Sequence, residues 1–202
     1  MRTIKKVASH IFIDGFGGMT QGLFATLIIG TMIQQIGLLI GGSTGNVIYL
    51  LGKAAAALTS AGIGVGVAVK YGESPLVTVS AAVAAMVGGY AGKITGGTFF
   101  VDGNAVLAGP GEPLGAFIAA FAGITCGHLV SGKTKVDIIV TPVITIGAGS
   151  VVGLLVGPPI SQMMTGLGSI INWATEQRPF IMGIVVSVVM GICLLYTSPS
   201  PR

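Results

Sequence analysis

The sequence is poor in charged side chains. Ten Lys or Arg and six Asp or Glu residues make up 8% of its 202 residues, whereas an ordinary soluble domain carries about 25%. So few charges cannot cover the surface of a globule of this size, while 52% of the residues are hydrophobic and the mean hydropathy is +0.92. This composition excludes a soluble monomer and predicts an integral membrane protein.

Cysteine is also scarce, and the motifs of several common chemistries are missing. The two cysteines, Cys126 and Cys193, lie inside apolar runs, so neither a disulfide nor a metal site is expected. The sequence has no Ser/His/Asp set, no HExxH and no paired carboxylates, and no cofactor is predicted. Its basic residues are scattered rather than gathered in a stripe, which argues against nucleic acid as a partner.

Glycine, in contrast, is abundant. There are 34 glycines, and they follow no G-x-y period, which excludes collagen. Small residues let membrane helices approach closely, so the recurring G-x-x-x-G spacings are interpreted as helix-packing faces. These spacings are Gly18/Gly22, Gly37/Gly41, Gly62/Gly66, Gly88/Gly92, Gly123/Gly127 and Gly149/Gly153.

Apolar runs near the length that a bilayer requires recur along the chain. A membrane-spanning helix needs about 20 apolar residues. Six runs meet this requirement: residues 22–40, 47–69, 75–91, 114–130, 136–156 and 179–195. The fold class predicted is therefore all-α integral membrane, a polytopic helical bundle with about six spans.

Two segments between the runs are not plain loops. Residues 93–113 are apolar but broken by glycine, proline, Asp102, Asn104 and Glu112, and such backbone is tolerated at membrane depth only where protein buries it or it lines a wet cavity. A re-entrant hairpin fits this pattern. Residues 158–176 have one apolar and one polar helical face, with Trp173 suited to the headgroup level. This predicts an interfacial helix, and a buried bundle helix is the alternative.

The first thirteen residues form a basic amphipathic pattern. Arg2, Lys5 and Lys6 fall opposite an apolar face, as in a helix that lies on an anionic cytoplasmic leaflet. With the N-terminus inside, six Lys or Arg residues lie on the cytoplasmic side and three on the other. The count therefore favours a cytoplasmic N-terminus.

Glu112 is the leading candidate for a binding residue. It lies between Pro110 and Pro113, where the broken segment meets the fourth run. An ionisable group near hydrocarbon is usually paired or functional, and a carboxylate can accept two hydroxyl hydrogen bonds at once, as sugar recognition requires. A proton-carrying role is a second possibility, and capping of the following helix is the structural alternative.

Asp102 and Asn104 are further candidates in the same segment. The sequence VDGN is typical of a tight turn. Hydrogen bonding to substrate at the tip of the hairpin is the alternative role, and the residues alone do not decide between the two.

One pattern resembles a nucleotide-binding loop. Gly127, Gly132, Lys133 and Thr134 fit the P-loop expression, which depends on a strand that leads into a glycine loop and a helix. Here two predicted membrane helices flank the pattern, so no nucleotide is expected to bind.

Three stretches carry a resemblance to a known family. GNAVLAGPGEPLGAFIAAFAG (103–123) resembles enzyme IIC, the membrane permease subunit of the bacterial phosphoenolpyruvate-dependent sugar phosphotransferase system. IDGFGGMTQGLFATLIIGTMIQQIG (13–37) and VDIIVTPVITIGAGSVVGLLVGPPIS (136–161) are similar to its perfringolysin-regulator-like branch. Gly111, Glu112 and Pro113 match the family's glycine–glutamate–proline motif, whose glutamate contacts the sugar in a re-entrant element.

The resemblance implies a function and its partners. It implies a homodimeric permease in the bacterial cytoplasmic membrane that binds a sugar, moves it by a rigid-body shift and presents it to enzyme IIB. Enzyme IIB carries a phosphocysteine or phosphohistidine and phosphorylates the sugar, and enzyme IIA is a further partner. Neither a IIA nor a IIB domain is attached, and no phosphorylated or catalytic residue of its own is evident, so whether the chain counts as an enzyme stays open. An ion- or proton-coupled transporter or channel, and a membrane-bound regulator that senses a ligand without transport, are the alternatives.

The end of the sequence changes character. Residues 196–202, YTSPSPR, break from the apolar run before them and resemble translated sequencing-adaptor read-through. Residues 1–195 are therefore interpreted as one enzyme IIC-like membrane domain truncated at its C-terminus, followed by a non-native tail.

Overall fold

The computed structural model describes residues 14–101, 104–105, 107, 109–133 and 136–177, together with positions 183 and 187. The amphipathic N-terminal segment, the tail and all of the sixth run except positions 183 and 187 lie outside these residues. The elements are α2 (Phe16–Leu23), the π-helical segment η2 (Phe24–Ile28), α3 (Ile29–Ile40), α4 (Gly42–Ala57), α5 (Thr59–Lys70), α6 (Pro75–Gly89), α7 (Ala91–Thr95), β1 (Phe100–Val101), β2 (Asn104–Ala105), α8 (Pro113–Val130) and α9 (Asp137–Gln177).

The fold is helical and suited to a membrane. Three helical stretches in the described part are long and apolar enough to cross a bilayer: Phe16–Ile40, Pro113–Val130 and Asp137–Gly166. The pair α4 and α5 is a fourth candidate if the two helices count as one bent span, and α6 is a shorter apolar helix. The predicted all-α membrane class is confirmed; strand structure is limited here to a ladder of two residues on each side.

The second apolar run is not one continuous helix. It was expected to span residues 47–69, but the chain bends by 52° between α4 and α5, with Leu58 at φ −85° and ψ 9°. Hydroxyl residues follow the bend, and Thr59 Oγ1 donates a hydrogen bond to Ala56 O at 2.6 Å. A side-chain hydroxyl that donates a hydrogen bond to a backbone carbonyl at a helix end satisfies that carbonyl, which makes a break in the helix tolerable in an apolar environment.

The fifth run continues further than the sequence predicts. α9 extends to Gln177 with Pro142, Pro158 and Pro159 inside it, so the boundary expected at Pro158 is absent and residues 158–176 form the C-terminal part of α9. Close contacts flank the paired prolines, because Gly157 lies against Ala91 and Gly92 against Ser161. The interfacial position of this part stays a prediction.

Glycine faces pack the helices at most of the G-x-x-x-G spacings, whereas Gly41 lies in the turn between α3 and α4 with no atom near enough to pack against it. Gly18 and Gly22 of α2 lie against the backbone of Gly66 and Gly62 in α5, and further along the hairpin Gly30 faces Gly52. A second set of glycine contacts joins α6, α8 and α9. These close approaches bring the backbones together where larger side chains would hold them apart.

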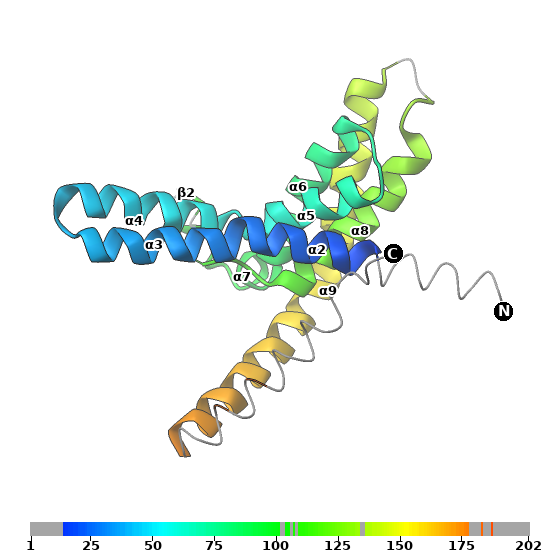
Figure 1. Ribbon diagram of the computed structural model, residues 1–202. Coiled ribbons are helices and arrows are strands. Elements are labelled where there is room, and N and C mark those ends of the chain that lie inside the picture. Colours follow the sequence, from blue (N-terminus) through cyan, green and yellow to red (C-terminus); the bar gives the residue numbers. More distant parts are fainter. Residues whose placement is uncertain are drawn as a thin grey trace.

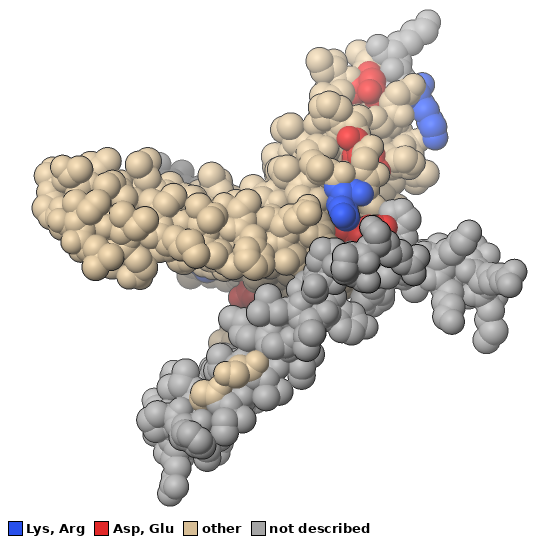
Figure 2. Space-filling model, in the orientation of Figure 1, with Lys and Arg blue, Asp and Glu red and all other residues tan. Residues whose placement is uncertain are grey.

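The helices form a body from which two parts project, the hairpin of α3 and α4, here called the arm, and the C-terminal part of α9 (Figure 1). α5, α6 and α8 enclose an apolar core that includes Ile63, Ala81 and Ala120. At its edge Phe117 stacks on Phe16 of α2, with ring centroids 5.1 Å apart. The hairpin of α3 and α4 extends away from this body. Its surface is mostly apolar, with Leu39 86% exposed. The face seen in Figure 2 shows no charge on the arm, whereas charged side chains gather at the body.

Candidate functional site

The site is built around the segment that leads into α8. Gly109 and Gly111 have φ values of +81° and +75°, a left-handed conformation that glycine adopts without steric cost. Glu112 is extended and occupies the N-cap position of α8, and Pro113 begins the helix. Proline is favoured there because its missing N–H leaves no hydrogen bond unmade.

Backbone and side-chain hydrogen bonds fasten this segment to the body. The Glu112 N–H donates to Gly89 O at the end of α6, at 2.7 Å. The Ser60 hydroxyl, fully buried in the first turn of α5, donates to Pro110 O at 3.0 Å. The segment is therefore held between two helix ends.

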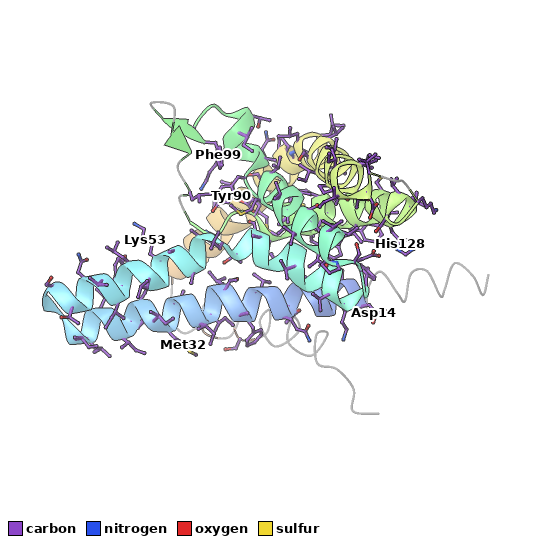
Figure 3. The ribbon with its side chains drawn as sticks, turned by 90° about the horizontal axis from the view of Figure 1, so that it is seen from above. Asp14, Met32, Lys53, Tyr90, Phe99 and His128 are labelled. Carbon is purple, nitrogen blue, oxygen red and sulfur yellow. The ribbon has the colours of Figure 1, made fainter. Side chains whose placement is uncertain are left out.

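Tyr90 provides a second connection. Only 1% of this residue is exposed, and its hydroxyl lies within hydrogen-bonding distance of two carbonyl oxygens, Ala57 O at 3.1 Å and Gly109 O. A phenol has one proton, so these two acceptors share it. The ring packs beside Phe99, with centroids 5.5 Å apart, and the Lys93 ammonium lies 5.3 Å from its centroid; Figure 3 shows Tyr90 and Phe99 near the two strands.

Four helix ends therefore meet at the candidate site. They are the C-terminal ends of α4 and α6 and the N-terminal ends of α5 and α8. Helix N-termini carry partial positive charge and C-termini partial negative charge, and membrane transporters commonly form substrate sites from such interrupted helices. The arrangement offers polar backbone inside an otherwise apolar bundle.

The Glu112 carboxylate has no partner among the described residues. The side chain is partly exposed and makes neither a capping hydrogen bond nor an ion pair there. Glu112 stands at the N-terminal end of α8, where a helix carries partial positive charge. An ionised carboxylate with both oxygens available can accept hydrogen bonds from two hydroxyl groups.

The other predicted site residues are placed less completely. Gly111 and Pro113 flank Glu112 along the chain. Asn104 lies in β2, opposite Val101 in the antiparallel ladder, while Asp102 lies outside the described residues. Their roles stay predictions. Ser60 and Tyr90 were not predicted, because no spacing in the sequence connects residues 60 and 90 with residues 109–110.

A second polar cluster lies at the other end of the bundle. His128 Nδ1, in the last turn of α8, lies 2.9 Å from a Glu73 carboxylate oxygen. In the turn after α8, the Gly132 N–H donates to Asp137 Oδ1 at 3.0 Å. The loop that resembles a P-loop is therefore preceded by a helix rather than a strand. Its Gly132 N–H, which a P-loop would offer to a phosphate, is already bonded to Asp137.

Interrupted apolar helices with a carboxylate where helix ends meet are a recurring feature of membrane transport proteins. The family model "Phosphotransferase system, EIIC" matches residues 13–200, and the chain belongs to this family. The match does not distinguish branches of the family, so the perfringolysin-regulator-like branch stays a prediction. Neither the curated proteins nor the solved structures give a match to this chain. The protein is accordingly a multi-pass membrane protein and a sugar permease subunit of a phosphotransferase system.

Proposed function

We propose that the chain binds and translocates a sugar, which a separate IIB protein then phosphorylates, and that Glu112 is the principal sugar contact. The observation that carries this proposal is the carboxylate itself. It stands at the junction of four helix ends, in a segment anchored by the Glu112 N–H and by Ser60, with no partner of its own in the described structure.

The proposed chemistry follows from hydrogen bonding. Two neighbouring hydroxyl groups of a sugar donate to the two Glu112 oxygens, and charge-assisted bonds of this kind are the stronger class. The same carboxylate polarises a hydroxyl toward attack on the phosphoryl group that the IIB partner carries. Gly111 has no side chain, which lets the segment pack against Ser60 and Gly89 beside Glu112. Asp102 and Asn104 contribute further hydrogen bonds from the adjoining hairpin, which we propose is re-entrant.

The proposal extends to the setting of the protein. The apolar surface of α3 and α4 faces lipid, the N-terminus is cytoplasmic and the permease works as a homodimer in the bacterial inner membrane. The single Lys53 on the arm (Figure 3) is exposed, and its long side chain reaches the headgroup level by snorkelling.

Sugar binding by Glu112→Gln tests the proposal. Titration of the purified protein in detergent with hexoses, pentoses and polyols is expected to give saturable binding of one sugar by the wild type. The variant should weaken it by roughly 10- to 150-fold, because a hydrogen bond to a charged group contributes about 1.5–3 kcal/mol. Glu73→Gln is the matched control, since Glu73 lies beyond the far end of α5 from Ser60.

Other outcomes point elsewhere. Equal binding by wild type and Glu112→Gln contradicts the role of Glu112. Binding without sugar uptake by vesicles that contain the IIB partner favours the ligand-sensing regulator. Uptake that follows a proton gradient and is lost in Glu112→Gln favours the proton-coupled transporter.

A further inference from the structure

We propose that Tyr90 and Ser60 are positioning residues that anchor the sugar-binding segment, residues 109–112, to the break between α4 and α5. This inference rests on the proposed function for its meaning in sugar binding, but its structural part can be tested separately. Neither side chain is proposed to touch the sugar.

The two side chains act from opposite sides of the break. Tyr90 reaches Ala57 O, at the last residue of α4, and Gly109 O at the start of the segment. Ser60, two residues beyond the break, reaches Pro110 O. Together the two side chains connect α4 and α5 to the neighbouring carbonyl groups of Gly109 and Pro110.

Burial makes these bonds effective. Ser60 is 0% and Tyr90 1% exposed, so water does not readily replace the donors. A buried carbonyl that loses its donor bears the full cost of desolvation. The last carbonyls of a helix also lack partners within the helix, and the Tyr90 hydroxyl supplies one at the end of α4.

Shape limits the segment further. Gly89 and Gly111 both lie against the Ser60 side chain, where a Cβ atom at either position would collide with it. The segment therefore has little room to move toward α5 or α6. The hydroxyl groups of Ser60 and Tyr90 fix its position relative to the N-terminal end of α5. The angle of α4 to α5 and the location of Glu112 are connected through the same two residues.

Tyr90→Phe and Ser60→Ala test this inference. Tyr90→Phe keeps the ring that packs on Phe99 and removes only the hydroxyl. Tyr49→Phe is the control, because the Tyr49 hydroxyl on α4 makes no hydrogen bond to described residues. Amide hydrogen exchange in detergent, read by mass spectrometry, reports the segment directly, since the Glu112 N–H is bonded to Gly89 O.

Each positioning variant is expected to speed exchange of the Glu112 amide, the one in this segment with an observed hydrogen bond, about ten-fold, while exchange in the middle of α8 is unchanged. Sugar affinity should fall by about the same factor, and Tyr49→Phe should change neither quantity. If Tyr90→Phe does not fold, Ser60→Ala still tests the anchor from the other side of the break.

Three results overturn the inference. Unchanged exchange in residues 109–112 shows that the hydroxyl groups do not hold the segment. Faster exchange throughout α6 and α8 shows a general structural role instead. Faster local exchange with normal sugar affinity, alongside lost affinity in Glu112→Gln, shows that the anchor does not serve binding. Failure of the proposed function is recognised separately, by normal sugar affinity in Glu112→Gln itself.

Discussion

Gly18→Ala should destabilise the contact between α2 and α5. A Cβ atom at Gly18 would lie 2.6 Å from Gly66 O, 2.7 Å from Val67 Cα and 2.8 Å from Gly66 C, whereas ordinary contact begins at 3.4 Å. All three neighbours are backbone atoms, so no rotamer change relieves the collision and the helices must separate by roughly 0.8 Å. Overpacking of this kind costs about 1–3 kcal/mol, against a helix-propensity gain of about 0.5–1 kcal/mol.

Gly17→Ala is the matched control for this change. It makes the same substitution one position earlier in α2, but the nearest atom to the new Cβ is Lys70 Cε at 3.8 Å. We expect thermal unfolding in detergent, followed by far-ultraviolet circular dichroism, to show a lower midpoint for Gly18→Ala by roughly 2–8 °C. The midpoint of Gly17→Ala should be equal to the wild type or higher. Equal midpoints for the two variants would refute the close-packed glycine interface.

The binding segment and the turn after α5 give two further predictions. Gly111→Ala should weaken sugar binding far more than Gly109→Ala, because both residues have positive φ but only the Cβ at 111 meets Ser60 and Gly89. Similar sugar affinities for the two variants would contradict this. Burial, and then the charge of Asp14, raise the pKa of Tyr71 above its ordinary value. The unfolded chain therefore loses the Tyr71 proton first, so stability should fall as pH rises above about 10. Tyr71→Phe should reduce that fall in a series of unfolding midpoints, and an unchanged slope would argue against the shift.

The sequence predicts most helices well because their apolar runs are continuous and because residues such as proline mark where the runs begin or end. The fourth run, residues 114–130, agrees with α8 to within one residue, since Pro113 marks its start. The first run begins at residue 22 by composition, whereas the continuous helix begins at Phe16. The additional turns include Gly17 and Gly18, and the packing of Gly18 on α5 explains why residues of low helix propensity are helical there.

The irregular parts of the fold are less accessible to sequence reasoning. Residues 47–69 are apolar on both sides of Leu58, so hydropathy gives no sign of the 52° bend. Conversely, the paired prolines at 158 and 159 suggest a boundary that α9 does not have. In both cases the backbone conformation depends on contacts between segments far apart in the sequence. A local sequence pattern carries no information about those contacts.

The candidate site divides in the same way. Glu112 is recognisable because a charge between prolines at the edge of an apolar run is unusual. Ser60 and Tyr90 are not recognisable, because serine and tyrosine are ordinary residues in or near membrane helices. Their significance depends on hydrogen bonds that span 50 and 19 residues of the chain.

A second irregular helix lies beside the break between α4 and α5. The helix that packs against α4 and α5 changes to π geometry over Phe24–Ile28, and Thr26 there lies against Gly62, four residues beyond Leu58. Both the segment Phe24–Ile28 and the junction of α4 and α5 thus leave regular α geometry. At each, a hydroxyl group donates to a backbone carbonyl: Thr26 donates to Gly22 O at 2.7 Å, and Thr59 donates to Ala56 O. Such departures recur at functional sites, and in a membrane they require surrounding protein or water to satisfy the backbone. The π-helical segment and the break between α4 and α5 therefore lie side by side, and the break is also where Ser60 and Tyr90 hold the segment that carries Glu112.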